Sequence, residues 1–193
     1  MSAARHGRGE GRVIARVLAA TALGLLLVGR ADASDDVGRL LEPLGLTALS
    51  GSRPAGFTLP AVSGGKVSLS EQQGKVVLVY FWATWCPYCR RELPAGVERI
   101  TRERRGQPFT VLAVNIEEPK DLVASWLKGA GVTLPVLLDY DGAVARDYRV
   151  TATPTTFVIG RDGRLIARAA GNREWEGPAG RALLDALVAA PAK

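Results

Sequence analysis

The stretch KVVLVYFWATWCPYCRRELP, residues 75–94, decides the fold. It opens with a run of β-branched and aromatic residues, which is typical of a strand buried on both faces. A helical composition follows, with Pro87 at the first helical position and Pro94 inside the helix, where the missing backbone donor should kink it. This order predicts a buried strand, a turn that ends at Cys86, and a helix whose first turn carries Cys89.

Short strands and helices alternate along the rest of the chain. Two strands around a turn at 63–65 form a predicted hairpin at 57–70, and a second hairpin turns at Asp162 and Gly163. The other predicted elements are a buried strand at 109–116, a short apolar segment at 134–139, and helices at 119–129, 142–150 and 178–189. The sequence therefore predicts an α/β fold, with a central mixed sheet, helices on both faces and an N-terminal β-hairpin.

Residues 1–33 have the composition of a secretory signal peptide. Several arginines precede an apolar run at 17–28, and small residues follow at Ala31 and Ala33. The run is shorter than the roughly 20 apolar residues that span a bilayer, and it fits the core of a signal, which has about 7 to 15. We expect export to the periplasm and cleavage before Ser34, with an uncleaved membrane anchor as the alternative.

The remaining chain is only mildly basic. The whole chain has a formal net charge of +6, and removal of residues 1–33 takes away five basic and two acidic residues, which leaves +3. The densest basic cluster, 99–106, includes Glu103 and lies at a predicted helix end, where the helix dipole favours cations. We therefore expect no nucleic-acid partner, and membrane contact only through an uncleaved N-terminal segment.

The two cysteines, Cys86 and Cys89, are the only thiols of the chain, and the sole histidine, His6, lies in the signal. A structural bridge over so short a loop would add little stability, because the entropic effect of a disulfide grows with loop length. A zinc site would need further ligands, and the mature chain has no third Cys and no His. A Cu(I) site made by the two thiolates stays an alternative, because copper accepts soft ligands.

Reversible thiol-disulfide exchange fits the position of the pair best. The sulfur of Cys86 should face the free amides at the start of the helix, where a thiolate is stabilised and the pKa of a thiol falls below its usual value of about 8.5. We predict that Cys86 is the exposed, attacking sulfur and that Cys89 is the covered sulfur that resolves the mixed disulfide. The disulfide would carry the chemistry, so we expect no organic cofactor and no bound metal.

The segments YFWATWCPYCRRELP, VLAVNI, LPVLLD and ATPTTFVIGRDGRL lie between about Pro54 and Ala190. On these segments the chain resembles the TlpA-like and ResA-like thiol-disulfide oxidoreductases of the thioredoxin superfamily. The resemblance implies a thioredoxin fold over 57–193, preceded by an extension or linker at 34–56. It implies a monomer that acts on protein thiols and disulfides, apocytochrome c among them, with electrons from a membrane thiol donor.

The resemblance also assigns roles around the cysteines. It implies that Pro154 is a cis proline opposite them and that backbone groups of Thr153 pair with a bound client. Trp85, Pro87 and Tyr88 are expected to contact the client as well. The two residues between the cysteines, Pro87-Tyr88, are the pair found in glutaredoxins. Because this pair tunes the redox potential, the sequence leaves open whether the protein acts as a reductant or as an oxidant.

The acidic residue near the cysteines is at a different sequence position than in thioredoxins proper. Those proteins carry a buried Asp where this chain has Tyr80. The periplasmic relatives place a Glu three residues after the second Cys, and here that residue is Glu92, one helical turn from Cys89. The resemblance implies that Glu92 exchanges a proton with Cys89, directly or through water. Peroxidase chemistry is a weaker alternative, because Thr84 stands only two residues before Cys86.

Overall fold

The computed structural model describes residues 33–192, with the side chains described from Val37 on. The predicted signal at 1–33 falls almost entirely outside this range. Between residues 33 and 192, no helix combines the length and apolar character needed to cross a bilayer.

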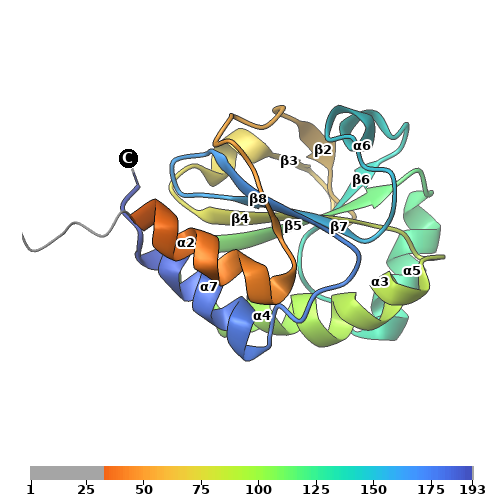
Figure 1. Ribbon diagram of the computed structural model, residues 1–193. Coiled ribbons are helices and arrows are strands. Elements are labelled where there is room, and N and C mark those ends of the chain that lie inside the picture. The colour runs from red at the N-terminus through yellow and green to blue at the C-terminus, as the bar shows by residue number, and fades with distance from the viewer. Residues whose placement is uncertain (1–32, 193) are drawn as a thin grey trace, which may run out of the picture. The chain divides into compact units, whose positions relative to one another are not determined.

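A six-stranded mixed sheet forms the centre of the molecule, in the order β1-β8-β7-β4-β5-β6 (Figure 1). Strands β4, β5 and β6 pair in parallel, whereas β7, β8 and β1 add antiparallel pairs on the other side of β4. The predicted mixed sheet is therefore confirmed. The strands are β1 (Thr47–Ala48), β4 (Val76–Trp82), β5 (Phe109–Ile116), β6 (Val136–Asp139), β7 (Thr155–Ile159) and β8 (Leu165–Ala170).

Every residue of β4 is buried, because the two faces of the sheet pack into separate hydrophobic cores. Successive side chains of a strand point to opposite faces. Leu78, Tyr80 and Trp82 accordingly lie in one core, and Val79 and Phe81 lie in the other. This is the environment that the apolar run at 75–82 predicts.

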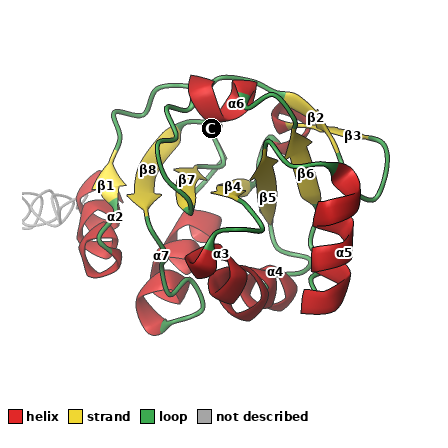
Figure 2. Cartoon of the chain, turned by 90° about the vertical axis from the view of Figure 1, so that its right-hand side faces the viewer, coloured by secondary structure: helices red, strands yellow, loops and turns green. Residues whose placement is uncertain are grey.

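Helices cover both faces of the sheet, as predicted (Figures 1 and 2). The core that contains Tyr80 is closed by most of the helices, and the opposite core by α6 and the hairpin of β2 (Thr58–Pro60) and β3 (Lys66–Ser68). The helices are α2 (Ala33–Leu41), α3 (Pro87–Glu92), α4 (Glu98–Glu103), α5 (Lys120–Ala130), α6 (Ala143–Asp147) and α7 (Pro178–Ala189), with short 3-10 turns η1 (Glu42–Leu44) and η2 (Leu69–Gln72).

The helix that starts after Cys86 is interrupted where Pro94 was expected to kink it. Between α3 and α4 the chain forms a π-helical segment, η3 (Leu93–Val97), which contains Pro94. A proline removes one backbone donor, and a wider π turn is one way to accommodate that loss within a helix.

Residues 34–56 contribute more to the core than the linker interpretation indicates. The side chains of Leu41, Leu44 and Leu46 are buried against the sheet, and Thr47 and Ala48 pair with β8 and form the edge strand β1. Gly, Pro and Ser at the end of this segment are typical of a linker, but its leucines bury apolar area only when they dock on β8 and α7. The packed unit therefore begins before residue 57.

Two helical glycines give a matched test of this packing. A methyl group added at Gly180 in α7 would overlap the backbone of Trp175, whereas one added at Gly129 in α5 would meet nothing within 4 Å. We expect Gly180→Ala to lower the free energy of unfolding by about 3 kcal/mol through overpacking. Gly129→Ala should raise it by about 0.5–1 kcal/mol. Urea denaturation of the oxidised proteins measures both, and equal stabilities would contradict the described contact.

Candidate active site

The two cysteines lie where β4 leads into α3. The strand ends at Trp82, a short turn follows, and Cys86 is the N-cap of α3. The Sγ of Cys86 accepts a hydrogen bond from the backbone N–H of Cys89 at 3.1 Å, and the two sulfurs form a disulfide. The predicted position of Cys86 at the positive end of a helix that begins with Pro87 is confirmed.

Cys86 is less exposed than the sequence predicts. Its exposed fraction is 2%, against 0% for Cys89, so both cysteines are buried in the oxidised protein. The covering group comes from the loop before β7, where the Thr153–Pro154 peptide bond is cis. The carbonyl oxygen of Thr153 lies 3.5 Å from the Cys86 Sγ. The tertiary structure therefore brings Thr153 and Pro154 to the cysteines, as the resemblance implies.

The residues expected to contact a client surround Cys86 on the surface. Trp85, Pro87 and Tyr88 are all exposed. The guanidinium of Arg91 lies over the Tyr88 ring, 5.4 Å from its centroid, a geometry that favours a cation–π contact.

Glu92 is buried at the end of α3, with hydrogen bonds that do not involve a cysteine. Its carboxylate accepts from the Tyr80 hydroxyl at 3.1 Å and from the backbone N–H of Arg173 at 2.9 Å. Among the contacts of residues 37–192, none is a hydrogen bond between Glu92 and Cys89. Proton exchange between these two residues therefore remains a prediction.

Burial sets the protonation of this carboxyl group. Loss of solvent raises the pKa of Glu92 to about 7, although the hydrogen bonds from the Arg173 N–H and the Tyr80 hydroxyl oppose the shift. The pKa of Tyr80 is raised by burial and by the Glu92 charge, so its hydroxyl stays protonated and acts as the donor. A carboxyl group with a pKa near neutrality suits a residue that accepts and releases protons.

Glu118 is a buried residue beside the turn that leads to Cys86, and its sequence context does not reveal this role. Its carboxylate accepts hydrogen bonds from the backbone N–H and the hydroxyl of Thr84, the former at 2.7 Å, and from the side-chain amide of Asn115 at 2.7 Å. It thereby fixes the turn that carries Cys86. The adjacent Glu117 is exposed, and sequence alone does not tell the two apart. The one available signal was Asn115, a polar residue in a buried strand, which needs a buried partner.

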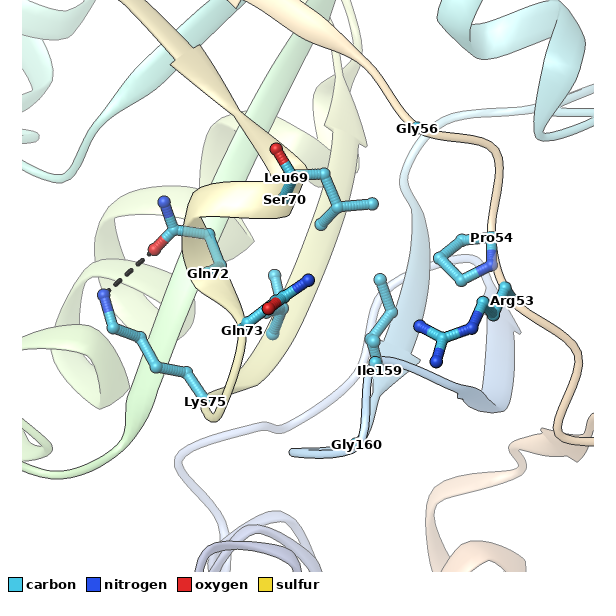
Figure 3. Close-up of a pocket in the computed structure, with 12 residues that line it drawn as sticks. Arg53, Pro54, Gly56, Leu69, Ser70, Gln72, Gln73, Lys75, Ile159 and Gly160 are labelled. Carbon is cyan, nitrogen blue, oxygen red and sulfur yellow. Dashed lines mark hydrogen bonds between the residues drawn. The ribbon is translucent and has the colours of Figure 1, made fainter. Parts of the chain in front are cut away.

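A separate hollow of ≈ 160 Å³ lies at the other end of β4 (Figure 3). Val77, Ile159 and Leu69 contribute to its lining, and the Lys75 ammonium donates to the Gln72 side chain at 3.0 Å. The length of β4, roughly 20 Å at about 3.3 Å per residue, separates this hollow from the cysteines. It is therefore not part of the candidate active site.

Comparison with known sequences places the chain in a family. Residues 51–168 match the profile of the AhpC/TSA family, and this match spans more than half of the chain. The chain belongs to the AhpC/TSA family.

Proteins similar in sequence to this chain carry names that refer to thiol-disulfide or thioredoxin-like proteins. The chain is 36% identical to the thiol-disulfide oxidoreductase ResA of Bacillus subtilis over 116 residues, which is 60% of this chain and 64% of that protein. It is 38% identical to the thioredoxin-like protein YneN of the same organism over 116 residues, 58% of this chain and 66% of YneN. The matches thus cover less than two thirds of these two relatives.

Solved structures confirm the thioredoxin fold. A Chlorobium tepidum protein described as a thiol:disulfide interchange protein DsbE superposes with a TM-score of 0.66 at 29% identity, over 74% of this chain and 99% of that one. StoA of Bacillus subtilis superposes with a TM-score of 0.57 at 25% identity, over 64% of this chain and 92% of StoA.

Glu92 should make the stability of the oxidised protein depend on pH. Its pKa of about 7 in the folded protein exceeds the usual 4.5, so the folded state binds the proton more tightly than the unfolded state. Stability from this group is therefore present at low pH and falls as the pH rises from about 4.5 to about 7, by about 3 kcal/mol in total. In Glu92→Gln this fall should disappear, as measured by urea denaturation at several pH values.

Tyr80→Phe is the matched control, because it removes one hydrogen bond and leaves the carboxyl group in place. Since that bond lowers the pKa of Glu92, its loss should extend the fall in stability to higher pH. An unchanged pH profile in Glu92→Gln would show that another group causes the titration.

Proposed function

We propose that this chain is an exported thiol-disulfide oxidoreductase that reduces disulfides in client proteins. The observation that carries the proposal is the Cys86–Cys89 disulfide at the start of α3, beside the cis peptide bond before Pro154. A disulfide between cysteines three positions apart adds little stability, so a redox role explains it better than a structural one. The printed names of the ResA and DsbE relatives support the same chemistry.

The proposed reaction has two steps and consumes a reduced dithiol. The thiolate of Cys86 attacks one sulfur of the client disulfide, so that a mixed disulfide forms and the second client sulfur leaves as a thiolate that takes up a proton. Cys89 then loses its proton and attacks the Cys86 sulfur. This step forms the Cys86–Cys89 disulfide and releases the first client sulfur. In total, two electrons pass to the client, and both of its sulfurs leave as thiolates that take up a proton each from the surroundings.

The residues around the disulfide have separate tasks in this proposal. The N-terminal amides of α3 stabilise the Cys86 thiolate, and the Cys89 N–H already points at that sulfur. Glu92, with a pKa of about 7, accepts the proton of Cys89 through water. Thr153 and Pro154 present backbone to the client chain next to Cys86. A membrane thiol donor would then reduce the disulfide again.

The setting of the reaction follows from the N-terminal sequence. We place the protein in the periplasm, as a monomer released from a cleaved signal at 1–33. Its clients would be exported proteins whose cysteines must be reduced before use, such as apocytochrome c or another protein that assembles a metal site.

Peroxidase chemistry is less well supported. Its usual motif places a Thr hydroxyl near the reactive cysteine, but here the Thr84 hydroxyl donates to the buried carboxylate of Glu118. The Cu(I) alternative uses the same two sulfurs in their reduced form. Very tight 1:1 binding of Cu(I) to the reduced protein, together with slow disulfide exchange, would favour that alternative.

Cysteine variants test the proposed division of roles. Cys86→Ser should lower the reduction of insulin to the uncatalysed rate, because it removes the attacking sulfur. Cys89→Ser should still attack and should accumulate mixed disulfides with clients, visible by mass spectrometry and reversed by dithiothreitol. Full activity in Cys86→Ser would refute the proposal, and the absence of trapped species in Cys89→Ser would refute the assigned order.

The equilibrium potential of the pair decides the direction of electron flow. We expect a value near that of thioredoxin, about −270 mV, which suits a reductase. Titration against dithiothreitol and glutathione buffers measures it. A value near about −120 mV would instead identify an oxidant of the same fold.

A further inference from the structure

Exposed large apolar side chains gather at one edge of the sheet. Between residues 37 and 192 they are Trp85, Tyr88, Leu122 and Tyr140, with exposed fractions between 49% and 67%. Each follows the carboxyl end of a parallel strand: the first two follow β4, Leu122 follows β5 and Tyr140 follows β6. The helices after these strands, α3, α5 and α6, lie toward the right-hand side of Figure 1, the side that Figure 2 turns to the viewer.

The segments that follow β4, β5 and β6 are joined to one another by hydrogen bonds. The turn before Cys86 is bound to the next loop by the Thr84–Glu118 hydrogen bonds. That loop is bound to the following one, because the Glu117 N–H donates to the Asp139 carbonyl at 2.9 Å. The turn before Cys86 and the segments that follow β5 and β6 are therefore held next to one another at this edge.

Leu122 faces outward at this edge. It lies in the first turn of α5, whose Val123 and Leu127 pack into the core. Side chains of a helix lean toward its N-terminus, and the N-terminus of α5 lies at the carboxyl edge of the sheet. The exposed Leu122 side chain thus leans toward this edge.

We propose that Leu122 and Tyr140 are a specificity subsite for apolar residues of the client near its cysteine. The inference rests on the proposed function, because it extends the client surface from Cys86 across β5 to β6. Strands lie about 4.8 Å apart, so β6 is about 10 Å from β4, and an extended client covers that distance with three to five residues. Clients with large apolar side chains at that spacing from the cysteine would be preferred.

Charge does not provide an alternative basis for selection here. Exposed groups of both signs lie on these loops and helix starts: Arg90, Arg91, Lys120, Asp121 and Asp141. A surface of mixed charge does not favour an acidic or a basic client, so apolar contact is left as the main discriminator.

Two synthetic disulfide peptides test the subsite. They have equal length, and one carries Leu and Phe three to five residues from its cysteine on both sides, whereas the other carries Ser at those positions. Single-turnover reduction by the reduced full chain gives the rate constants. Leu122→Ser combined with Tyr140→Ser should lower the rate for the apolar peptide about tenfold, because partial burial of two side chains is lost. The rates for the Ser peptide and for glutathione disulfide should change less than about twofold.

Control variants separate this effect from general damage. Tyr140→Phe keeps the ring and should retain the preference, and Lys66→Ser on the distant hairpin should change neither rate. Equal losses on both peptides, or no loss on the apolar one, would overturn the subsite while the proposed function stands. If the unmodified chain reduces neither peptide nor glutathione disulfide, the proposed function itself is wrong.

Discussion

The pairing of β4 between β5 and β7 is the constraint on which the site depends. All residues of β4 are buried, so the strand has no freedom to shift without moving apolar side chains of both cores into water. Its carboxyl end is therefore fixed in space, and so is the turn to Cys86. Because β7 is antiparallel to β4, β7 starts at the same edge, and the loop that carries Pro154 ends there and meets the sulfur. The fold thus places the two halves of the site together without a direct link between them.

Two buried carboxylates stabilise this edge in different ways. Glu118 is tied to the turn by short hydrogen bonds from Thr84 and supports the position of Cys86. Glu92 is also buried, and there burial outweighs its hydrogen bonds and raises its pKa to about 7. Glu118 holds the turn before Cys86 in position, and Glu92 is a carboxyl group that titrates near neutral pH. A dithiol that exchanges protons as well as electrons makes use of both.

Much of the fold was predictable because its signals are local. The apolar run of β4, Pro87 at the start of α3 and the Asp162-Gly163 turn each depend on neighbours in the chain, and the structure confirms all three. The helix at 178–189 agrees with the prediction to the residue. The site was predictable to the extent that it depends on the Cys86–Cys89 pair and on the resemblance of the surrounding segments.

The sequence by itself determined the strand, the turn, the helix and the pair of sulfurs, because these follow from spacing and composition. Only the tertiary structure decided that Cys86 is covered by Thr153 and that Glu118, not Glu117, is the buried acid. It also decided that the leucines of 34–56 pack into the core. In each case the deciding contact joins residues far apart in the chain. The burial of a side chain depends on the distant segment that packs against it, and local sequence does not specify that segment.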